Sequence, residues 1–311
     1  MTSVSEWYEM SDTGRRILAV GVAALDIVNE VATYPVEDAE LRVLARRFLR
    51  GGNAANTLAV LRQMGHGCSW AGTMGSDPEG TQVLEDLELR GIATGNCVRH
   101  PGGSTPTSYV TLSRATGSRT ILHYRDLPEL SAADFSGIRL EGYDWVHFEG
   151  RDPEKTAPMV RDCARRRLPG TGISLEVEKP RPQIESLFTG PDVLVFSRSY
   201  AESCGHTDPR RFLADQWSRT DARLLVLPWG EDGAYAQARD RDIYHSPAHR
   251  PKQVRDTLGA GDVFNAALID GLLSELPLPV LLARCTALAG HKCGLMGLDA
   301  LVESAHGAGV L

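Results

Sequence analysis

The sequence predicts a three-layer α/β/α domain with a mainly parallel central sheet, and three observations support that prediction. Short runs of branched apolar residues alternate with longer helical patterns through the second half of the chain. These runs are apolar on both sides, as expected for strands that crossover helices cover on both faces. Two half-polar stretches, at about 27–50 and 104–125, interrupt the alternation and indicate a separate small sheet.

The predicted elements of the main domain follow in chain order. An apolar run near the beginning and four later runs are the expected strands: Ile17 to Ala24, Tyr143 to Phe148, Gly172 to Val177, Asp192 to Phe196 and Arg223 to Leu227. Residues 57–64 and 80–90 have the apolar spacing of helices. Because no Pro/Ser-rich linker occurs, we expect one domain over residues 17–302, with loose tails at 1–16 and 303–311.

The two half-polar stretches are expected to form an antiparallel lid over one edge of the main domain. The first contains the turn signal Tyr34-Pro35, and the second has the pattern of a hairpin around Ala115-Thr116-Gly117. An exposed sheet of this kind can cover a ligand or pair with a second copy of the protein. Both uses remain open from the pattern alone.

Composition excludes several classes of protein. The 311 residues carry a formal net charge of -7, which disfavours binding to nucleic acid or to an anionic membrane surface. The apolar run from Ile17 to Leu25 is far shorter than the roughly 18 to 20 residues that cross a bilayer. The six cysteines include no Cys-x-x-Cys pair, so we expect reduced thiols and a cytoplasmic protein.

The segment from residue 256 to 267 has the clearest chemical pattern. Gly259, Ala260 and Gly261 precede apolar residues at helical spacing, which places them at a helix entry. The first N–H groups of a helix lack internal partners and lie at the positive end of its dipole, so a phosphoryl group can approach them. Asp262 beside them would repel phosphate but could accept the proton of an attacking hydroxyl. The alternative is an aspartate that merely caps a helix.

Three further segments are candidates for ligand contacts. Asp26 is expected at the end of the first buried strand, where open parallel sheets bind ligands, although it could be a simple turn residue. Residues 51–56 offer backbone amides and two carboxamides to a polyol, or form a plain loop with an Asn cap. Residues 229–233 offer a glycine-lined slot beside an aromatic ring, or a hairpin turn. The candidates are Asp26, Gly52, Asn53, Asn56, Trp229, Gly230, Glu231, Asp232 and Gly233.

Several familiar motifs are absent from the sequence. It contains no G-x-x-x-x-G-K-[ST] loop, no His-Arg-Asp catalytic loop and no G-x-G-x-x-G after the first expected strand. The nine histidines show no metal-ligand spacing. The residue pattern therefore assigns no metal ligand.

Two of these segments resemble the motifs of a known family. Residues 256–262, DTLGAGD, and residues 50–56, RGGNAAN, are similar to the C-terminal and N-terminal motifs of the ribokinase (PfkB) family of carbohydrate kinases. The segments at 33–38, 117–122, 147–151, 176–181 and 292–297 resemble the ketohexokinase (fructokinase) branch of that family. The resemblance extends from about residue 17 to 302, which is nearly the whole chain.

The resemblance implies a ribokinase-like fold with a β-clasp lid and a defined reaction. ATP, with magnesium, would donate its terminal phosphoryl group to the primary hydroxyl at C1 of a ketohexose such as fructose. Asp262 would be the base, the turn Gly259–Gly261 the anion hole, and Arg119 would lie near the phosphates. Sugar hydroxyls would contact Asp26, Gly52, Asn53 and Asn56, and the nucleotide would lie along residues 229–233 and 259–261.

The resemblance also implies partners and leaves alternatives. The lids of two subunits would interlock in a homodimer, with Asp38 reaching the partner's sugar, and a monovalent cation such as potassium would use carbonyls near Asp256. The Asn-x-x-Glu motif common in the family is replaced by Ser197-Arg198-Ser199-Tyr200, so Glu176 and Glu178 are the candidates for ordering magnesium. Another acceptor (ribose, another ketose, a sugar acid or a nucleoside) and a non-catalytic sugar-binding regulator are the competing hypotheses.

Overall fold

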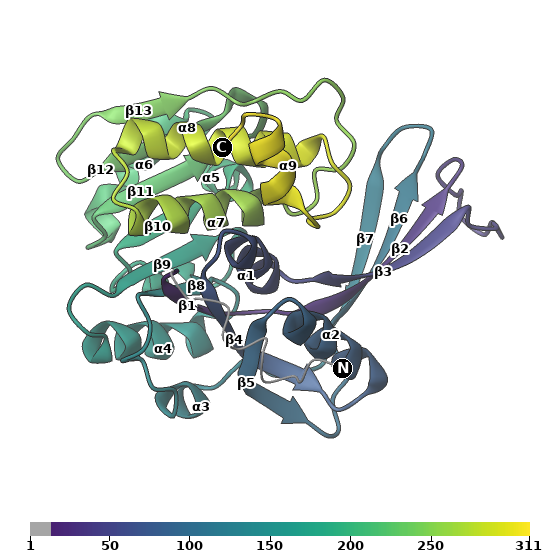
Figure 1. Ribbon diagram of the computed structural model, residues 1–311, viewed down its shortest axis with the longest axis horizontal. Coiled ribbons are helices and arrows are strands. Elements are labelled where there is room, and N and C mark those ends of the chain that lie inside the picture. The colour runs from purple at the N-terminus through teal and green to yellow at the C-terminus, as the bar shows by residue number, and fades with distance from the viewer. Residues whose placement is uncertain (1–13) are drawn as a thin grey trace.

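The computed structural model describes residues 14–311, so residues 1–13 of the expected N-terminal tail lie outside the described part. A nine-stranded sheet forms its centre (Figure 1). The strands are β1 (Arg16–Val20), β4 (Gly67–Gly75), β5 (Ile92–His100), β8 (Trp145–Glu149), β9 (Gly172–Val177), β10 (Val193–Phe196), β11 (Leu224–Pro228), β12 (Ala234–Ala238) and β13 (Ile243–Ser246). Their spatial order is β13-β12-β11-β10-β9-β8-β1-β4-β5, and every pairing is parallel except those of β12 with β11 and with β13.

Helices cover both faces of this sheet. Residues of one face pack against α1 (Asn53–Gln63), α2 (Pro78–Leu89), α7 (Ala260–Leu273), α8 (Leu278–Cys293) and α9 (Leu301–Gly307). Residues of the other face pack against α3 (Ala132–Ser136), α4 (Pro153–Arg166), α5 (Arg198–Ser203) and α6 (Pro209–Gln216). Along β1 the side chains alternate between the two cores, with Ile17 in the first and Leu18 in the second. No helix within residues 14–311 is both long enough and apolar enough to cross a membrane.

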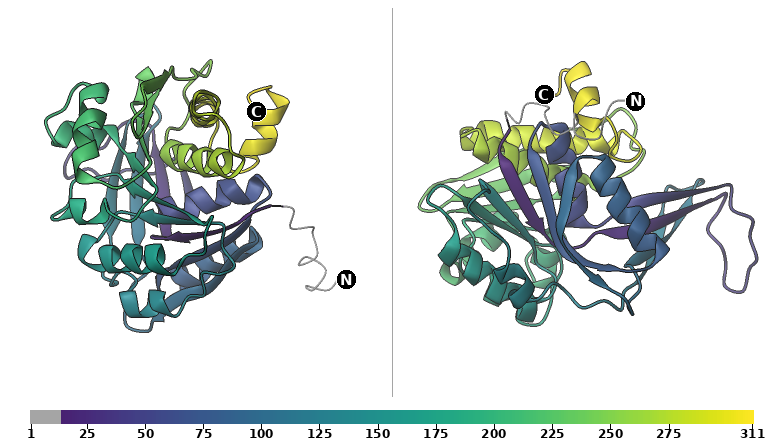
Figure 2. Two further views of the ribbon diagram at one scale, coloured as in Figure 1. Left: turned by 90° about the vertical axis from the view of Figure 1, so that its left-hand side faces the viewer. Right: turned by 60° about the horizontal axis from the view of Figure 1, so that its bottom comes forward.

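A four-stranded lid sheet projects from the main body (Figures 1 and 2). It consists of β2 (Ala24–Val31), β3 (Ala45–Gly51), β6 (Thr107–Ser113) and β7 (Arg119–Tyr124), in the order β3-β2-β6-β7. The two outer pairs are antiparallel, while the central pair β2-β6 is parallel because the chain visits the main domain between these strands. The predicted α/β/α architecture with a mainly parallel central sheet and a small lid sheet is confirmed, but the lid, which was expected to be antiparallel, has a parallel central pair.

The two faces of the lid carry different side chains. On one face Asp26, Ser108 and His123 are neighbours across β2, β6 and β7. On the opposite face the next register position forms an apolar row, which we call the outer row: Phe48, Ile27, Tyr109 and Leu122. Because strand side chains alternate, the polar row of Asp26, Ser108 and His123 and the outer row lie on opposite faces of the same four strands.

Some predicted boundaries differ from the structure. β1 ends at Val20, and the chain passes from Gly21, whose N–H donates to Ala71 O, into the lid; Asp26 therefore lies within β2 and not at the end of a strand of the large sheet. A Cβ at Gly21 would lie 2.6 Å from Glu149 Oε2, so the backbone crosses there only because glycine has no side chain.

Helix boundaries also differ at both ends of the chain. α1 begins at Asn53 and not at residue 57, so the two candidate asparagines lie in its first turn. Helix α9 crosses residue 303, where the C-terminal tail was expected to begin, and buries Ala305 in the core. Strands β4, β5, β12 and β13 were not predicted.

Candidate active site

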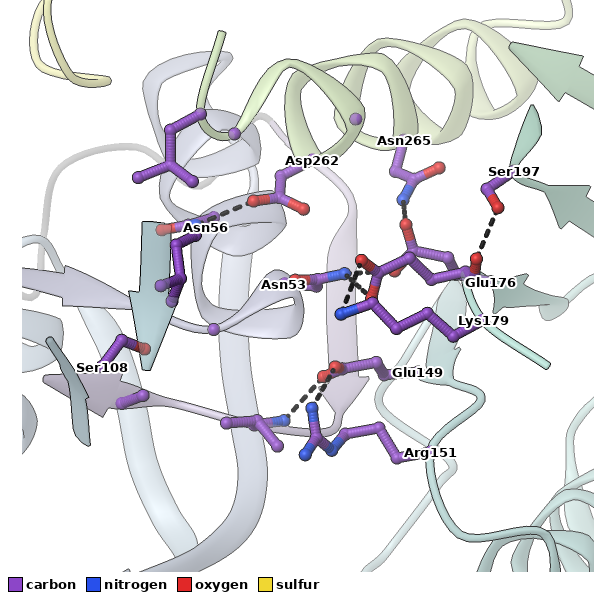
Figure 3. Close-up of a pocket in the computed structure, with 18 of the residues that line it drawn as sticks. Asn53, Asn56, Ser108, Glu149, Arg151, Glu176, Lys179, Ser197, Asp262 and Asn265 are labelled. Atoms are coloured by element: carbon purple, nitrogen blue, oxygen red, sulfur yellow. Dashed lines mark hydrogen bonds and ion pairs between the residues drawn. The ribbon is translucent and has the colours of Figure 1, made fainter. Parts of the chain in front are cut away.

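A cavity of about 640 Å³ lies between the lid and the carboxyl ends of the large-sheet strands (Figure 3). Eight of the residues predicted from the sequence line it: Asp26, Gly52, Asn53, Asn56, Arg119, Gly259, Gly261 and Asp262. They come from four places in the chain, namely β2, the start of α1, β7 and the start of α7. The fold thus brings the two sequence motifs and the lid arginine to one cavity.

A second cavity of about 580 Å³ adjoins the first and shares Pro228, Thr257 and Gly261 with it. Its wall is largely apolar and includes Phe264, Ala289 and Cys293. The predicted Gly230, Glu231, Gly233 and Ala260 also line it. A flat apolar base could lie here while an attached phosphate chain extends over Gly261 into the first cavity.

Two predicted residues of the slot lie elsewhere. Trp229 is only 4% exposed and packs in the core of the α3–α6 face, with the guanidinium of Arg198 5.3 Å from its ring. Neither Trp229 nor Asp232 lines the second cavity. The indole ring of Trp229 therefore fills part of the core and is not free to stack on a ligand.

Helix α7 presents free backbone amides to the first cavity. Gly259 adopts a left-handed conformation (φ 81°) at the N-cap position directly before α7, which places Gly261 and Asp262 in the first turn. Within residues 14–311 the N–H groups of Gly261 and Asp262 have no hydrogen-bond acceptor. A Cβ at Gly261 would meet only open space, so the approach to these amides is clear. Such a helix end can hold an anion.

Asp262 is buried beside these amides and is oriented by its neighbours. Its Oδ2 accepts a hydrogen bond from Asn56 Nδ2 at 2.7 Å. The buried Arg50 guanidinium donates to Asn56 Oδ1 at 2.6 Å, which fixes the amide so that its N–H₂ points to Asp262. Burial, and then the charge of Glu176, raise the pKa of Asp262 well above its usual value.

Glu176 is fully engaged by two carboxamides. Its Oε2 accepts from Asn53 Nδ2 and its Oε1 from Asn265 Nδ2, each at 3.0 Å (Figure 3). Burial, followed by the charge of Glu149, raises the pKa of Glu176 to about 7. Both carboxylate oxygens are therefore held in place by carboxamide groups.

Glu178 has looser contacts than Glu176. Its oxygens lie 3.5 Å from Asn53 Nδ2 and 3.3 Å from Lys179 Nζ. This half-exposed carboxylate fits a contact to magnesium through water. No group of three or more His, Cys, Asp or Glu side chains in the described chain could hold a metal ion by itself.

The lid reaches the turn before α7 through one side chain. Arg119 Nη1 donates to Thr257 Oγ1 at 2.7 Å, so the guanidinium lies over the entrance to the helix end. On the same face of the lid, Ser108 Oγ lies 3.2 Å from His123 Nδ1. Burial raises the pKa of Asp26, against the lowering effects of Ser108 and Arg50. Asp38 lies in the loop between β2 and β3 and does not line the cavity of its own chain.

Several residues of the cavity were missed by sequence reasoning. Glu149 accepts from Val22 N at 2.8 Å, and Arg151 lies 3.5 Å from Glu149 Oε1. The missed lining residues are Ser108, His123, Glu149, Arg151, Lys179, Arg181 and Asn265. Glu149 is the last residue of β8, and Arg151 follows that strand closely. Lys179 and Arg181 follow β9. The rule that ligands bind at the carboxyl ends of parallel strands could therefore have identified these four.

A helix end with free backbone amides, a buried carboxylate beside it and a covering lid are the parts expected of a small-molecule kinase of the ribokinase-like fold. The chain belongs to the pfkB family of carbohydrate kinases, whose family model matches residues 15–304. It is a sugar kinase.

Individual relatives and structures agree with this membership. Ketohexokinase of Mus musculus is 36% identical over 295 residues, which cover 93% of this chain and 99% of the relative. Fructokinase-1 of Zea mays is 27% identical, with 83% of each chain covered. The fold matches a putative ribokinase from Agrobacterium tumefaciens (TM-score 0.80, 20% identity, 95% of this chain and 98% of the other). It also matches an Arabidopsis thaliana ribokinase complexed with ribose and ATP (TM-score 0.77, 17% identity, 94% and 98%).

Proposed function

We propose that this chain transfers the terminal phosphoryl group of ATP to the C1 hydroxyl of a ketohexose such as fructose, which gives fructose 1-phosphate. The observation that supports this most directly is the position of Asp262, a buried carboxylate next to two free helix-end amides. The similarity to mouse ketohexokinase, 36% identity over nearly the full length of both chains, supports the choice of acceptor.

In this proposal the nucleotide lies across both cavities. The adenine base occupies the apolar second cavity, and the terminal phosphate meets the amides of Gly261 and Asp262. Arg119 neutralises charge on the phosphates from the lid side. Magnesium, when bound to the phosphates, supplies further charge neutralisation, with Glu178 as the carboxylate able to contact its water.

The acceptor lies between the lid and α1. Asp26, Asn53 and Asn56 offer acceptors and donors to the ring hydroxyls. Asp262 accepts the proton of the attacking hydroxyl as the oxygen–phosphorus bond forms, and the bond to the leaving ADP oxygen breaks. The lid keeps water away from the phosphoryl group during this step.

We also propose that the enzyme is a homodimer joined through its lids. Three residues of the outer row are strongly exposed in the single chain: Phe48 is 46%, Tyr109 48% and Leu122 67% exposed. A contiguous apolar sheet face of this kind is the expected contact for a second copy. Asp38, at the far end of the lid loop, then reaches the partner's cavity.

An ATP-coupled assay across a panel of acceptors tests the proposed reaction. The panel contains fructose, tagatose, psicose, ribose, a gluconate-type acid and adenosine. We expect the highest kcat/KM with fructose and a product phosphorylated at C1, identified by phosphorus NMR. Preference for the sugar acid would instead indicate that Arg151, Lys179 and Arg181 bind a carboxylate, and preference for ribose or adenosine would also contradict the proposal.

A further inference from the structure

A buried lysine lies directly behind the helix-end anion site. Lys292, near the end of α8, is fully buried (0% exposed). Its Nζ donates to the backbone oxygen of Asp256 at 2.8 Å and to Asp256 Oδ2 at 2.7 Å. A lysine is rarely buried to this extent unless its charge is paired.

The remaining contacts of Asp256 tie the segment before α7 to the end of α8. Asp256 Oδ1 accepts from Leu258 N at 2.9 Å, and Oδ2 also accepts from Gly297 N at 3.1 Å. Cys293 O accepts from Arg255 N at 2.8 Å. Burial alone would raise the pKa of Asp256, but the hydrogen bond from Lys292 lowers it below its usual value. The carboxylate is therefore held charged.

The turn before α7 lies within a few residues of Asp256 in the chain. Thr257, which accepts the hydrogen bond from Arg119, follows Asp256 directly, and Gly259, the N-cap residue of α7, comes two residues later. A shift of Asp256 would therefore move both the Arg119 contact and the free amides. Precise placement of such groups is what phosphoryl transfer depends on.

A monovalent cation at this position would need the same oxygens of Asp256 as ligands. The family resemblance implies a cation near the Asp256 carbonyl, but that carbonyl and one carboxylate oxygen already accept hydrogen bonds from the Lys292 ammonium. An ammonium has the charge of potassium and lies at a similar distance from its oxygen partners. The residues present therefore do not fit a free ion at Asp256.

We propose that the Lys292 ammonium is a built-in cation that positions the turn before α7, so that this kinase needs no monovalent ion. Lys292 is a positioning residue, since it acts through Asp256 and does not line either cavity. The inference rests on the proposed phosphotransfer for its effect on turnover, but not for its effect on cation binding.

The test uses Lys292→Met, with Lys155→Met on the exposed surface of α4 as the matched control. Activity and thermal unfolding are measured in potassium chloride and in tetramethylammonium chloride at equal ionic strength. The wild type and the control should show the same kcat/KM and Tm in both salts. Lys292→Met should lose about tenfold or more in kcat/KM and unfold at lower temperature in tetramethylammonium, because Asp256 is left as an unpaired buried charge. Potassium should restore part of both losses.

A double variant and a binding assay keep the test decisive. Lys292→Met with Asp256→Asn removes both charges, so it should fold, should show weaker ADP binding by calorimetry, and should not respond to potassium. Stimulation of the wild type by potassium, or a Lys292→Met variant with normal kcat/KM in tetramethylammonium, would overturn the proposal. If the wild type phosphorylates no sugar, the proposed function fails, while the salt dependence of Tm and of ADP binding still decides the role of Lys292.

Discussion

Asp262 is subject to two opposing demands. Its burial and the nearby Glu176 favour the protonated form, whereas a general base must be ionised when the acceptor binds. A magnesium ion bound to the nucleotide would favour the ionised form, whereas the negative charge of the phosphates would oppose it. The empty site therefore favours protonated Asp262, and this proton must be lost before Asp262 can accept the proton of the acceptor hydroxyl.

The first prediction concerns this carboxylate. Asp262→Asn should lower kcat by about a hundredfold or more, since a positioned base supplies about two to four powers of ten. Sugar and nucleotide dissociation constants, measured by calorimetry, should stay close to those of the wild type, because the amide can still contact Asn56. Near-normal turnover would exclude Asp262 as the base.

The second prediction concerns pH. Glu176→Gln removes a negative charge beside Asp262, and this removal makes ionisation of Asp262 easier and lowers its pKa. Since the base must be ionised, the rising limb of the profile of kcat/KM against pH should move to lower pH. Glu154→Gln, on the exposed surface of α4, serves as the control and should leave the limb in place. A limb that moves to higher pH in Glu176→Gln would contradict the assignment.

At the scale of elements, a side-chain hydrogen bond joins β7 to the turn before α7. Arg119 extends from the lid strand to Thr257, so closing the lid and placing a cation over the helix end are one event. Arg50 likewise ties the lid to the main domain. It joins the end of the lid strand β3 to α1 through Asn56 and to α2 through Asp86. The lid is thus tied to both sides of the cavity, at α1 and at the turn before α7.

The third prediction follows from this contact. Arg119→Met should weaken ATP binding and lower kcat/KM by about tenfold or more, because a charge-assisted contact to the phosphates is lost. The KM for the sugar should change little. Arg114→Met in the same hairpin removes an exposed arginine that pairs with Glu30 and lines neither cavity, so its kinetics should match the wild type. Equal effects of the two substitutions would indicate a general loss of lid structure instead.

Local patterns predicted most of these elements, but not their junctions. The helix after Asp262 and strand β9 follow from apolar spacing and were placed correctly. The break at Gly21 was missed, since a backbone crossing that depends on Glu149, a residue far along the chain, leaves no local pattern. β4 is buried yet contains small and polar residues, so its sequence GCSWAGTMG lacks the branched apolar run of a buried strand.

The residues that line the cavity show the same limit of prediction from local sequence patterns. The glycine turn and Asn53 were found because their chemistry is local to a motif. Arg151 and Asn265 contribute only because the fold brings β8 and α7 to one cavity, and this proximity is a property of tertiary structure. Trp229, predicted to contact the nucleotide, lines neither cavity because its ring packs in the core.

For the whole molecule, the proposed dimer makes the unit of catalysis larger than one chain. The inner face of the lid lines the cavity, and Phe48, Tyr109 and Leu122 of the outer row are exposed and available to a second lid. In a closed twofold pair each cavity would receive Asp38 from the other chain.

Mixing two inactive variants gives the fourth prediction. A chain with Asp38→Ala and a chain with Asp262→Asn are unfolded and refolded together in equal amounts. If sites are shared, each hybrid dimer has one intact site, and activity should recover to about a quarter of the wild type, since half of the dimers are hybrids. If Asp38 serves its own chain, no intact site can form and activity stays at the level of the separate variants. A sizing column run on each variant alone verifies that both still form dimers.

The division of the lid into two faces also restricts how its length can change over evolution. Ser108 faces the cavity and its neighbour Tyr109 belongs to the outer row, so inserting one residue into β6 would exchange them. An insertion of one residue within β6 would then turn the Tyr109 phenol toward the cavity and the Ser108 hydroxyl toward the side of the outer row. Indels in this hairpin should accordingly accumulate in the turn at 114–118 and spare the strands.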